Sequence, residues 1–213
     1  MLNRSAAPRI AGSFTADDWS KVSAQLVPGQ DIESWDFAYE TFFRHRLSTR
    51  YLQPIEQLKV LGNCDGEGFS IVAIQCTLIE FLATTFKGMN YRYVRNGDPP
   101  LGDYEYGNGR GRTIFAEFLS SRHPFCNTFS LDLAKDFYAG VRCALLHEAR
   151  TRDGWLIQQR GSGTVLVEGP RKILFRDNLQ DDILDYVERY RNELLASPDR
   201  QAAFKRKWDC LCS

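Results

Sequence analysis

Arg142 and His147 are the residues of this chain whose types and spacing best suit a reaction, because they interrupt an otherwise apolar segment at residues 136–149. The planar guanidinium of arginine is a permanent cation that matches phosphate oxygens. The imidazole of histidine gains or loses a proton near neutral pH. Together they suit cleavage of an RNA phosphodiester, with His147 as general base or acid and Arg142 neutralising charge on the phosphorane oxygens. Because the ribose 2′-hydroxyl is an internal nucleophile, the pair predicts a catalytic site with no metal and no cofactor.

The segment resembles the motif of the HEPN superfamily, in which four residues separate an arginine from the histidine that follows it. Aromatic residues at 137–138, an apolar run at 141–146 and a helix exit at 151–154 accompany the motif. The resemblance covers residues 66–197 and implies a metal-independent endoribonuclease of the toxin–antitoxin or antiviral defence type. It also implies a homodimer that acts on RNA, with an antitoxin or other regulatory protein as a further partner. The products would carry 2′,3′-cyclic phosphate and 5′-hydroxyl ends.

Glu80 and Glu148 are expected to support the catalytic pair, because a carboxylate can orient an imidazole or a guanidinium. Gln75, on the same expected helix as Glu80, is a further candidate for this role. For Glu80 and Gln75 the alternative is a polar stripe on the surface of a helix. Tyr138 lies four residues before Arg142 and therefore shares its helix face, where it would stack on a base or pack.

Cys143 follows the arginine directly, where HEPN nucleases often carry a different polar residue. It lies four residues before His147, so a thiolate activated by the imidazole is a second possible chemistry. A small core side chain is the simpler interpretation of a cysteine between Arg142 and Ala144. For Arg142 and His147 themselves the alternative is structural, with the histidine in the core and the arginine extending to solvent.

Four arginines are candidates for RNA binding. Arg110 and Arg112 belong to a glycine-rich stretch at 107–112, just before an expected helix, where backbone amides and cations can hold a phosphate. Arg150 and Arg152 follow the motif closely and would form its RNA-facing rim. Lys plus Arg and Asp plus Glu both total 27, so the whole molecule exerts no net attraction on nucleic acid. RNA binding must therefore come from a local cleft.

The elements that position these residues are expected to form a mainly α, HEPN-like helical bundle with an inserted small β-hairpin and an N-terminal helical extension. Residues 1–65 would be a tail and helical arm, 66–197 the bundle, and 198–213 a basic helix or tail. The spacing predicts a central apolar helix at 69–86, a loop at 88–111, and helices at 113–122 and from 130 through the motif. Caps are expected at Thr15, Ser34, Ser130 and Asn178. The hairpin, at 155–175, would pair 155–159 with 164–167, with 172–175 beside it.

Composition narrows the class of protein further. No apolar run is expected to reach the roughly 18 residues of a membrane span, and the N-terminus lacks a signal-peptide layout, so the chain is predicted to be cytoplasmic with no membrane partner. The cysteines lack the paired spacings of a zinc ribbon or disulfide scaffold. They are Cys64, Cys76, Cys126, Cys143, Cys210 and Cys212.

On an ideal helix, five residues at about 100° each place Arg142 and His147 roughly 140° apart. They cannot then lie side by side, and three features would bring them to one phosphate: a long arginine side chain, a loosened turn near His147, or a second copy of the helix. We expect the last, a two-fold dimer. The alternative function is a catalytically inactive HEPN-like module that dimerises or binds a protein or nucleotide, which balanced charge and Cys143 favour.

Overall fold

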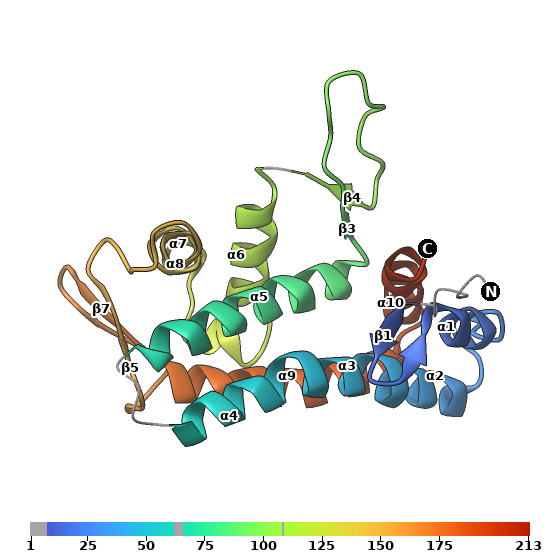
Figure 1. Cartoon of the computed structure of the whole chain (residues 1–213), viewed down its shortest axis with the longest axis horizontal. Coiled ribbons are helices and arrows are strands. Elements are labelled where there is room, and N and C mark those ends of the chain that lie inside the picture. The colour runs from blue at the N-terminus through green and yellow to red at the C-terminus, as the bar shows by residue number, and fades with distance from the viewer. Residues whose placement is uncertain (1–7, 62–65, 108) are drawn as a thin grey trace, which may run out of the picture.

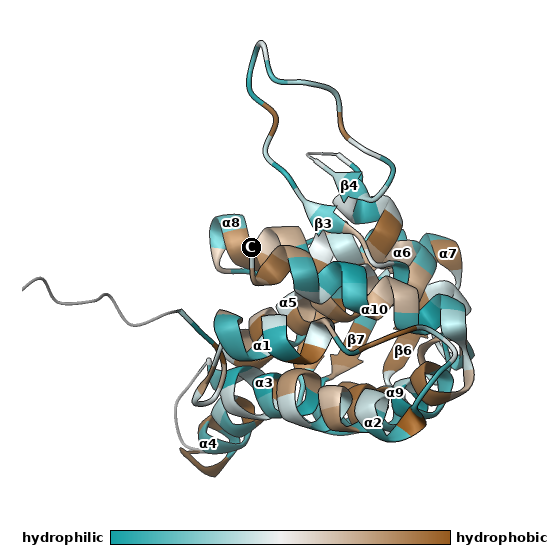
Figure 2. Cartoon of the chain, turned by 90° about the vertical axis from the view of Figure 1, so that its right-hand side faces the viewer, coloured by the Kyte–Doolittle hydropathy of each residue, from teal (hydrophilic) through white to brown (hydrophobic). Residues whose placement is uncertain are grey.

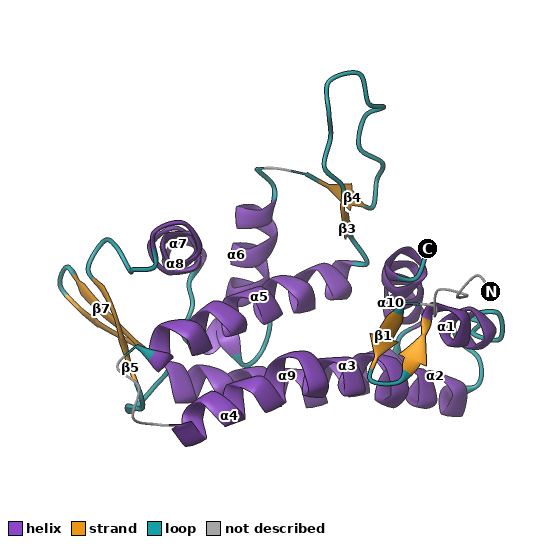
Figure 3. Cartoon of the chain, viewed as in Figure 1, coloured by secondary structure: helices purple, strands orange, loops and turns teal. Residues whose placement is uncertain are grey.

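Helices predominate in the part of the chain that the computed structural model describes, residues 8–61, 66–107 and 109–213 (Figure 3). The mainly α fold class is therefore confirmed. The α-helices are α1 (Ala16–Ser23), α2 (Ile32–Ala38), α3 (His45–Leu47), α4 (Gln53–Leu61), α5 (Glu67–Lys87), α6 (Gly111–Ser121), α7 (Leu131–Phe137), α8 (Ala144–Glu148), α9 (Arg176–Ala196) and α10 (Pro198–Leu211). The strands are β1 (Arg9–Ala11), β2 (Phe14–Thr15), β3 (Asn90–Tyr91), β4 (Glu105–Tyr106), β5 (Trp155–Gln158), β6 (Val165–Glu168) and β7 (Arg171–Phe175).

A long helical arm runs through α2, α3 and α4 and lies beside α9 (Figure 1). Two π-helical segments, η1 (Tyr39–Arg44) and η2 (Ser48–Leu52), join its α-helical parts. The predicted cap at Ser34 is wrong, because the Asp31 carboxylate accepts from the backbone N–H of Ser34 and caps the helix three residues earlier. The predicted boundary at residue 65 lies outside the described residues.

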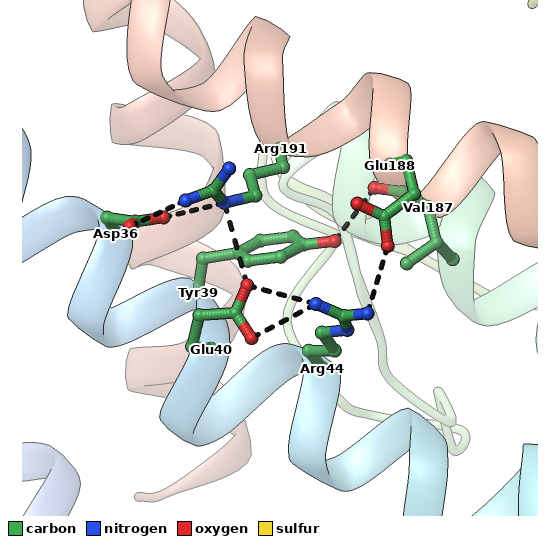
Figure 4. Close-up of polar contacts among 7 residues, drawn as sticks. All are labelled: Asp36, Tyr39, Glu40, Arg44, Val187, Glu188 and Arg191. Carbon is green, nitrogen blue, oxygen red and sulfur yellow. Dashed lines mark hydrogen bonds and ion pairs between the residues drawn. The ribbon is translucent and has the colours of Figure 1, made fainter.

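Ion pairs fasten this arm to α9 (Figure 4). Arg191 donates to both carboxylate oxygens of Asp36, each at 2.7 Å, and lies 3.5 Å from Glu40. Arg44 bridges Glu40 and Glu188, and the Tyr39 hydroxyl donates to the Val187 carbonyl at 2.8 Å. The arm therefore packs on the bundle through a buried tyrosine and a partly exposed charge network.

Helix α5 is central, as the apolar spacing predicts, and packs against α4, α6, α9 and α10. Its buried residues share one hydrophobic core with those of the arm and of α10. The expectation that no apolar run is long enough to span a membrane is wrong: by length and composition α5 passes that test, with 56% of the apolar window buried inside the fold. Gly88 ends α5 with a positive φ of 63°, a conformation that glycine adopts without strain.

The predicted hairpin is wrong in its pairing. Strand β7 lies between the other two, parallel to β5 and antiparallel to β6, so β6 and β7 form the hairpin and β5 joins its far side. The most buried of the three strands is β7, which ends in a run of buried apolar residues and therefore takes the central place. The expected cap at Asn178 is also wrong, because this side chain bonds the backbone of Gly161 while α9 begins at Arg176.

The remaining predictions of helix caps, helix starts and loops are confirmed in some places and wrong in others. The caps at Thr15 and Ser130 are confirmed, since each side chain accepts a backbone N–H of the first turn. Helix α6 begins at Gly111, two residues before the predicted Thr113. In the expected loop at 88–111, β3 and β4 form a short parallel pair, and the segment between them projects away from the helices (Figure 2).

The motif segment is fastened at two points, one on the three-stranded sheet and one on the turn before β5. Asp136 accepts hydrogen bonds from the Trp155 indole at 2.9 Å and from Lys172 at 2.6 Å. The Gly140 carbonyl accepts from the Arg152 backbone N–H at 2.8 Å. At Gly140 the backbone comes so close to the buried Trp155 that a Cβ would lie 2.6 Å from its Cδ1 atom.

We therefore expect Gly140→Ala to lower the free energy of unfolding by about 2 kcal/mol, because overpacking against a buried ring outweighs the better helix propensity of alanine. Urea unfolding measures the change. Gly163→Ala is the matched control, since nothing lies within 4 Å of its added Cβ. Equal stability of the two variants would contradict the close packing of the motif segment on Trp155.

Candidate functional site

Arg142 lies in a π-helical turn, η4 (Tyr138–Cys143), between α7 and α8. A π turn closes i→i+5 hydrogen bonds and holds more residues than an α turn, and such turns are frequent at functional sites. The widened turn contains Arg142. The loosened turn that the sequence suggested as one way to bring the two residues together was expected near His147 instead. The ideal-helix angle between the two residues therefore does not apply to this segment.

Glu80 of α5 holds the Arg142 guanidinium. Its Oε2 atom accepts from Arg142 Nη2 at 2.7 Å, and the two side chains are only 21% and 20% exposed. Burial lowers the pKa of Arg142, but the Glu80 carboxylate more than offsets this, so that the pKa is raised and the charge is permanent. The prediction that Glu80 faces the motif is confirmed by this contact. Gln75 does not face it, because Gln75 is fully buried and donates to Arg176 and Gln180.

Tyr138 packs on the same guanidinium, with Arg142 Cζ 5.1 Å from the centre of its ring. Burial raises the pKa of the Tyr138 hydroxyl, which therefore stays protonated at neutral pH. Phe115 packs on Tyr138 in turn. The two rings meet edge to face, with their centres 5.2 Å apart. Tyr138 thus helps to orient the Arg142 guanidinium, and both side chains line the same open space.

That space is a cleft of about 380 Å³, which we call the Arg142 cleft. Its lining is Glu80, Tyr91, Tyr106, Gly107, Gly109, Gly111, Tyr138 and Arg142. Helix α6 begins at its wall without a side-chain cap. A Cβ at Gly111 would lie 3.2 Å from the Tyr138 hydroxyl and 3.5 Å from Glu80, so glycine lets the helix start this close. An uncapped helix start beside an arginine favours an anion.

His147 lies outside the Arg142 cleft. It is exposed on α8 and forms no hydrogen bond or ion pair with any residue that the structure describes. The alternative in which His147 fills the core is therefore wrong. Cys143 is half-buried and interacts with Arg142, and the structure shows no contact between its thiol and the His147 ring.

Glu148 is engaged with other residues and does not orient the catalytic pair. It accepts from Arg150 Nε at 2.9 Å and from Arg152 Nε at 3.0 Å, which closes the turn after α8. Both arginines are therefore ion-paired with this one carboxylate and are not the free basic rim expected beside the motif. Arg110 and Arg112 are exposed at the start of α6 and have no ion-pair partner among the described residues.

Sequence reasoning missed three residues of this region. Tyr91 and Tyr106 line the Arg142 cleft from β3 and β4, and both belong to the stretch at 88–111 that the sequence predicts to be a loop. Lys207 belongs to the segment at 198–213 that is expected to be a basic helix or tail, yet it is buried. Its spacing from Ala203, Phe204 and Trp208, all buried on one side of α10, was the signal that placed it inward.

Among residues 8–61, 66–107 and 109–213, no group of three or more His, Cys, Asp or Glu side chains is arranged to hold a metal ion. Comparison with known proteins adds no relative: no family model matches this chain, and no curated protein or solved structure is significantly similar to it. The class that the fold defines is a mainly helical protein with a tyrosine-lined cleft around an arginine.

Proposed function

We propose that this protein is a metal-independent endoribonuclease of the HEPN type, with the Arg142 cleft as the site of the scissile phosphate. The observation that carries the proposal is the half-buried Arg142, held by Glu80 and Tyr138 beside the uncapped start of α6. A phosphate between the guanidinium and the helix start would meet fixed donors in a partly dry space, where electrostatic stabilisation of a phosphorane is strongest. Tyrosine rings offer stacking surfaces for the neighbouring bases.

The reaction follows from the chemistry of RNA. His147 would take the proton from the 2′-hydroxyl, whose oxygen attacks phosphorus, or would give a proton to the 5′-oxygen as its bond to phosphorus breaks. Arg142 would stabilise the two negative oxygens of the intermediate. The products would be a 2′,3′-cyclic phosphate and a 5′-hydroxyl, with no change in the number of protons.

His147 would reach the phosphate from a second copy of the chain. In one chain Arg142 lines the cleft while His147 lies exposed outside it, so the imidazole of the same chain is not among the groups that line the cleft. An isologous dimer with the two motif segments near its axis would place each His147 at the cleft of the other chain.

The protein is expected to cut single-stranded RNA in the presence of EDTA, because a 2′-hydroxyl attack needs no metal-bound water. Gel analysis of total RNA incubated with purified protein measures this, with DNA of the same sequence as the control. DNA lacks the nucleophile and should stay intact. Cleavage of DNA at the same rate, or loss of RNA cleavage in EDTA, would contradict the mechanism.

A catalytically inactive HEPN-like module that dimerises or binds a protein or nucleotide is the second candidate. The neutralisation of Arg142 by Glu80 and the position of His147 favour it. The same assay separates the two functions: an inactive module binds RNA or a nucleotide in the Arg142 cleft without producing cyclic phosphate ends. Partner proteins such as an antitoxin, and a role in defence, belong to the proposal and rest on the family resemblance alone.

A further inference from the structure

The Arg142 cleft continues into two further hollows along one side of α5. The second, of about 310 Å³, shares Glu80, Tyr106 and Arg142 with the cleft and adds Tyr51 and Lys207. A third, of about 230 Å³, shares Tyr51 and Thr77 with the second and adds Arg50 and Leu146. Because each hollow shares lining residues with the next, the three adjoin one another in a row, which we call the α5 groove.

The cations of this groove beyond Arg142 lack carboxylate partners among the described residues. Lys207 donates to the Met89 carbonyl at 2.9 Å, and Arg50 donates to the Arg9 carbonyl at 2.8 Å. Arg46, close behind Lys207, donates to the Ile10 carbonyl at 2.6 Å. Glu80, the carboxylate in the groove lining, is already paired with Arg142. The groove therefore has a local positive charge on a chain whose formal charges cancel.

Lys207 is the most deeply buried of the cations in the groove lining. Its side chain is only 5% exposed, and burial, the largest cause, lowers its pKa to about 8. An ammonium carries three donors, and Met89 uses one of them. A buried cation without a carboxylate is destabilising unless it finds an anion. An anionic ligand in the second hollow would supply that anion.

Each hollow of the α5 groove is lined by both aromatic rings and cations. Tyr138 and Tyr91 lie in the Arg142 cleft, Tyr106 is shared with the second hollow, and Tyr51 lies between the second hollow and the third. Rings and cations in one groove fit a single nucleic-acid strand, whose bases stack while its phosphates pair with lysine and arginine. A duplex keeps its bases stacked on one another and offers none to these tyrosines.

We infer that the α5 groove binds single-stranded RNA on the flank of the Arg142 phosphate, with Lys207 and Arg50 each contacting a further phosphate and Tyr51 stacking on a base between them. The inference rests on the proposed function for the nature of the strand. Lys207 and Arg50 are then binding residues that lie outside the segment resembling HEPN proteins.

The test is binding of a 2′-O-methyl oligouridylate of about eight nucleotides, within the usual site size of a single strand. This ligand cannot be cut, because its 2′-oxygen is blocked. Fluorescence anisotropy at several salt concentrations yields the slope of log affinity against log salt. Lys207→Met and Arg50→Ala should each reduce the magnitude of that slope by about 0.7, the value for one phosphate contact in a single strand. Tyr51→Ala should weaken binding about tenfold.

Lys205→Met is the matched control, because Lys205 lies on the same helix but bonds Ser23 and Asp209 away from the groove, and its slope should stay at the wild-type value. Thermal unfolding of each variant verifies the fold. If Lys207→Met does not fold, Arg50→Ala still decides, since Arg50 is exposed. Unchanged slopes in the folded variants, no binding by wild type, or equal binding of polyglutamate or duplex RNA would overturn the inference. Reduced slopes with no RNA cleavage by wild type would leave the groove standing and remove the proposed catalysis.

Discussion

His147→Ala protein is expected to cleave RNA about a hundredfold to ten-thousandfold more slowly than wild type, the usual contribution of a positioned proton-transfer group. Because His147 is exposed and forms no hydrogen bond or ion pair within the described chain, the substitution should leave stability nearly unchanged. Initial rates on a fluorescent RNA measure the effect, with circular dichroism to verify the fold. His123→Ala is the matched control, since His123 is also exposed but contacts Cys126, remote from the motif in sequence. A His147→Ala variant with full activity would remove the catalytic role.

Substitutions of Arg142 complete this prediction. Arg142→Ala should lose activity to a similar degree, and Arg142→Lys should not restore it, because a point charge does not reproduce the planar fork of donors. Arg142→Ala leaves the Glu80 carboxylate unpaired and only 20% exposed, which costs stability independently of catalysis. The double variant Arg142→Ala with Glu80→Gln removes that unpaired charge, so a folded but inactive double variant assigns the loss of activity to the guanidinium.

Mixing inactive Arg142→Ala and His147→Ala proteins is expected to restore about a quarter of wild-type activity, if subunits exchange freely. Random exchange makes half of the dimers mixed, and each mixed dimer has one of two composite sites intact. The reason is the separation seen in one chain, with Arg142 lining the cleft and His147 outside it. If both residues of a site came from one chain, no mixed dimer would have an intact site and mixing would restore nothing.

Light scattering at the working concentration is the accompanying measurement. An active monomer would contradict the composite site directly, because it would need His147 at the cleft of its own chain. A stable dimer that fails to regain activity on mixing would leave dimerisation standing and place Arg142 and His147 of each site on one chain. The two measurements therefore separate the assembly from the composition of its site.

Local sequence patterns determined much of the secondary structure. Helix periodicity placed the central helix and the motif segment, and the hydroxyl caps at Thr15 and Ser130 were located from neighbouring residues alone, because a cap depends on contacts within one turn. The order of the strands in the sheet could not be predicted from neighbouring residues. Strand β7 takes the centre of the sheet because its last residues are buried, and only packing against the helices decides which strand is buried on both sides.

The residue types at the candidate site were likewise evident in the sequence, whereas their partners were not. Glu80 meets Arg142 across 62 residues, and Glu148 pairs with Arg150 and Arg152 instead of His147. Lys207 enters the groove because α10 packs on α5. Spacing along a chain determines which face of a helix a side chain shares, but which charges meet depends on how helices distant in sequence pack together. Only the tertiary structure could decide that Arg142 lines a cleft and that His147 lies outside it.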